Sequence, residues 1–307
     1  MHATETKSYS SDAETSASVK AILDLPCPIP TFLEANFETI CENISEGKFG
    51  TNKLLRLKNS NLFMLGKTIN VPHEEMMVEA KCLAIMSGHN SFPIFFGYFG
   101  KTLLMQFVGE VRFKENMPCV TSATLKDYCL TKHKQVVTYD ICRLIVNAIN
   151  SLHTKKILHN DIHASNIVLK NNNEPVIVDL GKATSMLCPK VYGYISRSKQ
   201  LTIMKKHPQL APELVSNQGA QSVETDIYSI GVVFLNVGLS QNIPELVLLA
   251  RRLSHKRISE RPSLGDTLLA LSECSNKSEA INNKNWKKHP ELVLKEAVLK
   301  NIREAFP

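Results

Sequence analysis

Two short polar clusters, each next to an apolar run, constrain this chain more than any other feature. The first cluster contains Asp161 and Asn166. The second contains Asp179 and Gly181, and it follows the apolar run 176–178, thirteen residues after Asn166. A hairpin fits into that interval, and glycine permits the turn after Asp179. The fold is therefore expected to bring the two carboxylates and the amide together in one site.

This set of side chains suits phosphoryl transfer. The reaction needs a positioned hydroxyl and metal ions that neutralise charge on the phosphates. Mg²⁺ prefers oxygen ligands and keeps several waters, so Asp179 and Asn166 are sufficient protein ligands when the phosphates of a nucleotide complete the set. Asp161 is then available to accept the proton of the attacking hydroxyl.

The motif His159-Asn-Asp-Ile-His-Ala-Ser-Asn166 resembles the His-Arg-Asp-x-x-x-x-Asn catalytic loop of eukaryotic-type protein kinases, and Asp179-Leu-Gly resembles their Asp-Phe-Gly turn. Farther along the chain, Ala-Pro-Glu ending at Glu213, an Asp-x-x-Ser-x-Gly motif at Asp226, and Arg261-Pro also match this family. The resemblance is to a divergent serine/threonine kinase. It implies that Glu213 pairs with Arg261 and that Asp226 holds the catalytic loop.

The periodicity predicts an α/β (α+β) protein, and the resemblance implies the two-lobed kinase fold. Short apolar runs predict strands near 39–44, 53–57, 62–65, 94–98 and 102–107, with one helix over 73–86. Helical spacing predicts buried helices over 138–153, 223–237 and 243–253. We expect a small β-sheet N-lobe over 38–108 and a larger helical C-lobe over 109–275.

The two ends of the chain differ in composition from these lobes. Residues 1–21 have few large apolar side chains and are expected to form a disordered tail. Residues 22–37 contain three prolines and are expected to form an extended strap. Residues 276–307 are basic, and an amphipathic helix is predicted over 290–300, either packed on the large lobe or bound to a partner or an anionic surface.

Upstream motifs resemble the family's nucleotide site. Gly47 and Gly50 lie in a sequence similar to the phosphate-covering loop, where backbone amides approach phosphate. Lys67 matches the strand lysine that binds the α and β phosphates, and Glu79 is its expected ion-pair partner, with Glu75 as the reserve candidate.

The run 103–109 resembles the connector between the lobes, whose backbone groups bind adenine. Gln106 and Val108 would offer those groups. Met105 would lie behind the base, although a buried methionine at a strand end is equally an ordinary core residue.

Several positions depart from the family. Asn160 replaces an arginine that reads a phosphate on the activation segment, and His163 replaces a lysine near the transferred phosphate. Asn52 and Leu65 replace small apolar residues that cover adenine. We therefore expect a minimal kinase that does not depend on activation-segment phosphorylation, and a pseudokinase stays open as an alternative.

Composition and charge limit the expected location and binding partners of the protein. The chain has 307 residues and a formal charge of +7, and its apolar runs are far shorter than a membrane span. Its start lacks the basic-then-apolar pattern of a secretory signal, so we expect an intracellular protein in the cytoplasm, the nucleus or both. Eight scattered cysteines form no Cys-x-x-Cys pair. The expected partners are ATP, Mg²⁺ and a protein substrate, with no membrane or nucleic acid.

The leading hypothesis is transfer of the ATP γ-phosphate to serine or threonine hydroxyls of proteins. A kinase-fold module that binds a nucleotide or a partner without transfer is the alternative. A small-molecule phosphotransferase is a third reading, because such enzymes share the loop and the metal turn but not the motifs at Glu213, Asp226 and Arg261. The segment 181–211 carries several hydroxyls and is interpreted mainly as a solvated loop.

Overall fold

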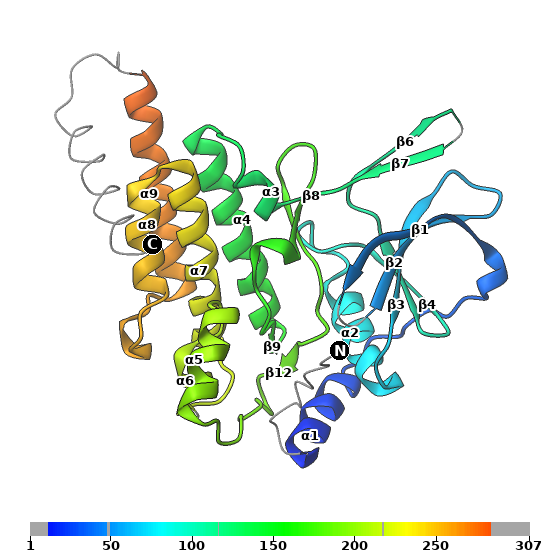
Figure 1. Cartoon of the computed structure of the whole chain (residues 1–307), viewed down its shortest axis with the longest axis horizontal. Coiled ribbons are helices and arrows are strands. Elements are labelled where there is room, and N and C mark those ends of the chain that lie inside the picture. Colours follow the sequence, from blue (N-terminus) through cyan, green and yellow to red (C-terminus); the bar gives the residue numbers. More distant parts are fainter. Residues whose placement is uncertain (1–11, 48–49, 116, 217, 284–307) are drawn as a thin grey trace.

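The computed structural model describes residues 12–47, 50–115, 117–216 and 218–283, which form two lobes (Figure 1). The smaller lobe contains an antiparallel five-stranded sheet with strand order β1-β2-β3-β5-β4. Its strands are β1 (Phe37–Gly47), β2 (Gly50–Leu57), β3 (Phe63–Ile69), β4 (Phe95–Phe99) and β5 (Thr102–Gln106). One long helix, α2 (His73–Met86), lies against β4. The predicted small sheet with one helix is confirmed.

The alternation of side chains along β3 places the first site residue. Met64 and Gly66 are buried on one face of this strand, and Lys67 lies on the opposite face. Successive side chains of a strand point to opposite faces, so the same pattern that fills the sheet's core directs Lys67 away from it.

The larger lobe is mainly helical. Its helices are α3 (Leu125–Tyr128), α4 (Gln135–Thr154), α5 (Arg197–Lys206), α6 (Pro212–Val215), α7 (Val223–Gln241), α8 (Pro244–Leu253) and α9 (Leu264–Asn283). The three helices predicted from periodicity correspond to α4, α7 and α8, and α9 packs against α4 and α8. The described helix α9 continues past residue 275, where the lobe was expected to end, and the helix predicted over 290–300 lies outside the described residues.

Short strands and the 3-10 turn η2 (Ala164–Asn166) carry the loops with the predicted catalytic and metal residues, whereas the other two 3-10 turns lie before β1 and after α8. The strands are β8 (Ala123–Thr124), β9 (Ile157–Leu158), β10 (Ile167–Leu169), β11 (Pro175–Ile177) and β12 (Thr184–Ser185). The 3-10 turns are η1 (Glu34–Asn36), η2 (Ala164–Asn166) and η3 (Ile258–Glu260). Strands β10 and β11 pair antiparallel, with Ile167 opposite Ile177. This is the hairpin that the sequence predicted between Asn166 and Asp179.

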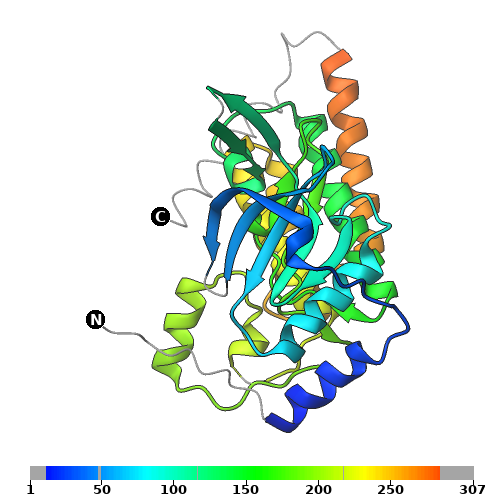
Figure 2. The same cartoon turned by 90° about the vertical axis from the view of Figure 1, so that its right-hand side faces the viewer.

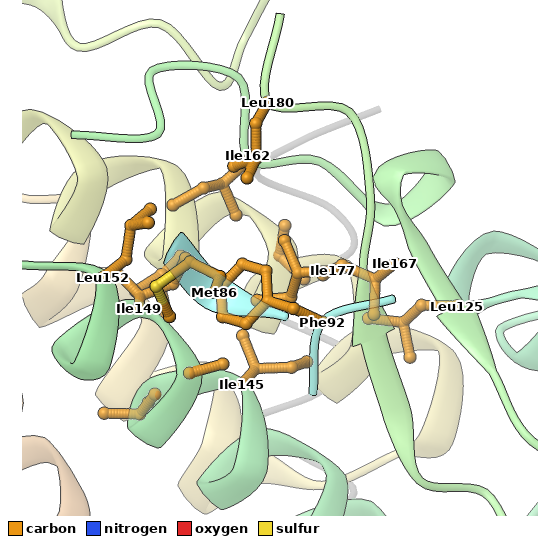
Figure 3. Packing of buried hydrophobic residues seen from close by; sticks show 14 of the residues in the cluster. Met86, Phe92, Leu125, Ile145, Ile149, Leu152, Ile162, Ile167, Ile177 and Leu180 are labelled. Atoms are coloured by element: carbon orange, nitrogen blue, oxygen red, sulfur yellow. The ribbon is translucent and has the colours of Figure 1, made fainter. Parts of the chain in front are cut away.

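A single cluster of buried apolar side chains joins the two lobes beneath the site (Figure 3). Met86 at the end of α2 packs with Ile145 and Ile149 of α4 in this cluster. Ile162 and Leu180, which flank the predicted catalytic and metal residues, belong to it as well. Complete burial of one such side chain stabilises a fold by about 1.5–3 kcal/mol, so both loops are held by apolar packing.

A β-hairpin between the lobes was not predicted. Strands β6 (Glu110–Lys114) and β7 (Met117–Thr121) pair antiparallel beside the sheet of the smaller lobe (Figure 1), where β7 contacts β1 and the ring centroids of Phe113 and Phe63 are 6.2 Å apart. The signal in the sequence was the alternation of Val111, Phe113 and Val120 around a polar turn, and it is weak because the hairpin is mostly exposed.

The expectation of a disordered tail over residues 1–21 is wrong for its second half. Residues Asp12–Leu23 form helix α1, which lies beside α2 and β12 (Figure 2). Ile22 is fully buried, and the buried Ser18 hydroxyl accepts a hydrogen bond from the Ser185 amide at 3.3 Å. Tertiary packing on one face stabilises this helix, although its composition is poor in large apolar residues.

The proline-rich segment after α1 runs along the edge of the small sheet. The Phe32 amide donates to the Tyr98 carbonyl at 2.9 Å, and the Tyr98 amide donates to the Pro30 carbonyl at 3.1 Å. The Lys81 ammonium of α2 donates to the Cys27 carbonyl at 2.7 Å. This segment therefore links α1 to β4 and α2. Within the described part of the chain, no helix combines the length and apolar character needed to cross a membrane.

Candidate active site

An ion triad connects the two lobes at the predicted nucleotide site. The Lys67 ammonium of β3 lies 2.6 Å from Glu79 Oε1 in α2 and 2.9 Å from Asp179 Oδ1. Glu79 is buried, whereas the reserve candidate Glu75 is exposed. The predicted pair between Lys67 and Glu79 is thus formed, and it includes Asp179 from the other lobe.

Burial and charge act against each other within this triad. Burial alone would lower the pKa of Lys67, but the carboxylates of Glu79 and Asp179 outweigh it and raise that pKa. Burial raises the pKa of Glu79 against the opposing effect of Lys67. Burial would also raise the pKa of Asp179, yet the Lys67 ammonium outweighs it and the net shift is downward. Lys67 therefore stays protonated at neutral pH.

The catalytic loop is anchored from below by Asp226 of α7. Its carboxylate accepts hydrogen bonds from the His159 amide at 2.9 Å and the Asn160 amide at 2.8 Å. His153 of α4 also contacts this carboxylate at 2.8 Å. The loop-holding contact that the resemblance implied for Asp226 is present.

Asp161 and Asn166 are oriented by the loop itself. The Asn166 carboxamide donates from Nδ2 to the Asp161 carbonyl at 3.0 Å. The Asp161 amide donates to Nδ1 of His159 at 3.2 Å. Burial lowers the pKa of His159, so its imidazole stays neutral and can accept this bond. Both predicted catalytic-loop residues are buried, with whole-residue exposures of 7% and 8%.

The predicted metal ligands are adjacent. The Val178 amide donates to the Asn166 carbonyl at 2.9 Å, so Asp179 directly follows a residue that is bonded to Asn166. Because Asn166 uses Nδ2 for the loop, its Oδ1 is the atom that suits Mg²⁺. Asp179 has a positive φ of 66°, which aspartate tolerates better than most residues, and its Oδ1 also accepts from the Gly181 amide at 3.3 Å. One amide oxygen and one carboxylate fit Mg²⁺ together with nucleotide phosphates.

Two side chains lie beside Asp161. Lys182 Nζ is 2.7 Å from Asp161 Oδ2, and His163 Nε2 is 3.9 Å from Asp161 Oδ1. The sequence reasoning considered His163 and did not consider Lys182. The available signal was its position, since Lys182 directly follows the turn formed by Asp179, Leu180 and Gly181.

Asn160 bonds to the chain that follows the metal turn. Its Nδ2 donates to the Thr184 hydroxyl at 2.9 Å and the Lys182 carbonyl at 3.0 Å. The residue adopts a positive φ of 63°. The position that holds a phosphate-reading arginine in the family is here occupied by a side chain that bonds within the protein.

The predicted phosphate loop is the turn between β1 and β2. Gly47 and Gly50 face each other across this hairpin, and residues 48–49 lie outside the described residues. A Cβ at Gly50 would come within 2.0 Å of the Thr68 carbonyl oxygen, so only glycine fits. Asn52 lies opposite Lys67 in the adjacent strand, and Leu65 of that strand is half-buried. That these two side chains cover adenine stays a prediction.

The predicted adenine connector follows β5. The Gln106 amide donates to the Ile94 carbonyl at 2.7 Å, and the Ser122 hydroxyl donates to the Val108 carbonyl at 2.7 Å. Adenine contacts at these residues would therefore use the Gln106 carbonyl and the Val108 amide. Met105 is buried at 3% exposure beneath them.

Residues 181–211, which correspond to the family's activation segment, have more regular structure than expected. Residues 184–185 form β12, which pairs with β9, and residues 197–206 form α5, so the interpretation of 181–211 as a loop is wrong for these parts. At the segment's end, Arg261 binds Glu213 through two contacts of 2.6 and 2.8 Å. Both side chains are buried, which confirms the ion pair that the resemblance implied.

Comparison with known proteins identifies the family. The protein kinase domain model matches residues 39–264, which is well over half of the chain. The chain therefore belongs to the eukaryotic-type protein kinase superfamily. The two-lobed fold and the matched motifs agree with this assignment.

Its relatives are serine/threonine kinases of modest identity. A probable cyclin-dependent serine/threonine-protein kinase of Dictyostelium discoideum is 30% identical over 115 residues, covering 37% of this chain and 17% of that protein. Mitogen-activated protein kinase kinase kinase 17 of Arabidopsis thaliana is 28% identical over 185 residues, covering 58% and 45%. Death-associated protein kinase 2 of Homo sapiens is 25% identical over 214 residues, covering 64% and 53%. The chain spans under a fifth of the first of these relatives and about half of the other two.

Proposed function

We propose that this chain is an active kinase that transfers the γ-phosphate of ATP to serine or threonine hydroxyls of proteins. The observation that carries the proposal is the ion triad, in which Lys67 lies 2.6 Å from Glu79 and 2.9 Å from Asp179. This contact brings the expected phosphate-binding lysine from one lobe to an expected metal ligand from the other. Of the three side chains, Glu79 is 4% exposed, Lys67 18% and Asp179 41%, so the ammonium offsets the charge of a buried carboxylate while Asp179 stays accessible to a ligand.

Different predicted site residues would bind the phosphates, the adenine and the Mg²⁺ ion. The backbone amides at Gly47 and Gly50 would cover the phosphates, and Lys67, held by Glu79, would bind the α and β phosphates. The Gln106 carbonyl and the Val108 amide would bind the adenine edge. Asn166 and Asp179 would hold Mg²⁺, which when bound neutralises charge on the phosphates.

Transfer itself requires one proton movement in the protein. The substrate hydroxyl oxygen attacks the γ-phosphorus while the bond from that phosphorus to the bridging oxygen breaks, and its electron pair stays on ADP. Asp161 accepts the hydroxyl proton. Asp161 is positioned for this role by its amide bond to His159 and by the Asn166 bond to its carbonyl.

The test is a labelling assay with purified full-length protein, labelled ATP and Mg²⁺. We expect label on the protein itself or on a generic substrate such as casein, and phosphoamino-acid analysis should yield phosphoserine and phosphothreonine. The Asp161→Asn variant is the control because it keeps the side-chain shape and removes the base. Equal labelling by both proteins, or no labelling by the native chain, would reject the proposal.

A kinase-fold module that binds a nucleotide or a partner without transfer is the second candidate. Asn52 and Leu65 support it, because a polar and a bulky side chain at the positions where the family covers adenine would alter how the base binds and so hinder transfer. Ligand that binds only the folded state raises its stability, so a thermal shift with ATP and Mg²⁺ reports binding alone. A shift without label would support this module over the kinase.

A further inference from the structure

The ammonium of Lys182 reaches the predicted base from outside the catalytic loop. Lys182 Nζ lies 2.7 Å from Asp161 Oδ2, and the Asp161 side chain is only 10% exposed. Lys182 is the first residue after the turn that presents Asp179. A contact this short with a nearly buried carboxylate differs from an ordinary exposed ion pair, whose partners are both solvated.

The loop position nearest to the base carries no fixed charge. His163 Nε2 lies 3.9 Å from Asp161 Oδ1, beyond hydrogen-bond distance, and an imidazole is charged only when it is protonated. The family places a lysine there. Within the described residues around Asp161, Lys182 therefore provides the permanent positive charge closest to the base.

The backbone that carries Lys182 is fixed to the catalytic loop. Asn160 donates to the Lys182 carbonyl at 3.0 Å and to the Thr184 hydroxyl at 2.9 Å. The Asn160 amide is bound in turn to Asp226 at 2.8 Å. Asn160, the residue before the predicted base, thus holds the main chain from which the Lys182 ammonium extends.

We propose that Lys182 supplies the positive charge at the transfer site that the loop position occupied by His163 lacks. This inference rests on the proposed function. Two successive hydrogen bonds place the ammonium within roughly 6 Å of a hydroxyl bound to Asp161, where charge builds up on the transferred phosphoryl group. Asp161 Oδ1 accepts the hydroxyl proton while Oδ2 stays bound to Lys182.

The proposal can be tested by removing the ammonium at position 182 and then placing a lysine at position 163, where the family has one. Lys182→Met removes the ammonium but keeps the main-chain carbonyl that binds Asn160. His163→Lys in the Lys182→Met background restores an ammonium beside Asp161 from the loop. The matched control is Lys155→Met, at an exposed lysine after α4.

The measured quantities are kcat and the KM for ATP with casein as acceptor, and the melting temperature of each variant. We expect Lys182→Met to lower kcat by about 10- to 100-fold, with the KM for ATP changed by less than about threefold. The double variant should recover most of this loss, and Lys182→Arg should retain more activity than Lys182→Met. Lys155→Met should stay within about threefold of the native kcat.

Each other outcome has a definite meaning. Native protein that transfers label while Lys182→Met keeps full kcat overturns this inference and leaves the proposed function standing. A loss that His163→Lys does not restore shows a structural role for Lys182 and overturns the charge assignment. A higher kcat in Lys182→Met shows that the lysine blocks the base, which also overturns it. Native protein without transfer overturns the proposed function and this inference with it. If Lys182→Met does not fold, Lys182→Gln carries the same expectations.

Discussion

The two ends of the candidate site are built in different ways. At the upper end, Lys67 and Glu79 occupy the positions expected from the family and contact each other at 2.6 Å. At the lower end, Asn160 and His163 replace family residues, and Lys182 contacts the proposed base, Asp161, from a different part of the chain. The upper end depends on charges held between a strand and a helix. The lower end depends on loop hydrogen bonds, so a missing side chain there can be replaced from a neighbouring segment.

The largest effect should come from the upper end. We expect Lys67→Met to lower kcat/KM by about 10²- to 10³-fold, because it removes the phosphate-binding charge and leaves Glu79 buried without its ammonium. Glu79→Gln should lower kcat/KM by a smaller factor. In the double variant the losses should be far from additive if the two side chains act as one unit.

Lys53→Met is the matched control for that experiment, since Lys53 is also a sheet lysine paired with a glutamate, Glu42, but at the surface. It should change kcat/KM by less than about twofold. Additive losses in the Lys67 and Glu79 cycle would show that the upper end is not an ion-paired unit, and the contrast between the two ends would fail.

At the lower end, loss of the Asn160 side chain should destabilise the fold. Asn160→Ala removes the donor to Lys182 and Thr184, and we expect unfolding free energy to fall by about 1–3 kcal/mol in urea titrations. Part of that loss reflects the positive φ of 63°, which alanine tolerates poorly.

Asn173→Ala provides the control for backbone strain, because Asn173 has a similar φ of 65° in the turn between β10 and β11. The difference between the two alanine variants then measures the hydrogen bonds of Asn160. Equal destabilisation of the two variants would show that the Asn160 hydrogen bonds do not contribute to the free energy of unfolding.

A smaller effect should appear on acidification, and it should arise at His159. Burial lowers the pKa of this imidazole in the folded state, so the unfolded chain binds a proton first. Its contribution to stability is complete above the ordinary histidine pKa of about 6.5 and is lost as the pH falls below that value. Urea unfolding between pH 7.5 and 5.5 should show a shallower decline for His159→Phe than for the native chain. Parallel declines would contradict this assignment.

The smallest expected effect is on kcat after removal of phosphate groups, where we expect almost no change. Asn160 stands where the family has the arginine that binds a phosphate on the activation segment. Phosphatase treatment should therefore leave kcat within about twofold of that of the untreated protein. Mass spectrometry should first establish which hydroxyls in 181–211 carry phosphate. A large drop in kcat after their removal would show that the lower end still depends on phosphorylation.

Local patterns predicted the parts of the molecule in which short-range signals determine position. Strand alternation places Lys67, helical spacing places Glu79, and the hairpin of β10 and β11 places Asn166 beside Asp179. Lys182 could not be found in this way, because its contact with Asp161 depends on how the chain turns after Gly181.

Helix α1 escaped prediction for a related reason. Among its described side chains from residue 17 on, the buried ones are Ser18 and Ile22, and their burial depends on surfaces of α2 and β12 that are distant in sequence. Composition describes what a segment can bury by itself, whereas this helix is stabilised by what it packs against.

Helix α1 also affects how this protein should be produced. A shortened version that follows the family match, residues 39–264, would omit α1 and most of α9. Because α1 rests on the helix that carries Glu79 and on the strand that follows Lys182, such trimming would expose apolar surface next to both ends of the site. We expect a version cut to the kinase boundaries to be less soluble and less active than one that starts before residue 12, so the boundaries chosen for expression would influence the measured turnover.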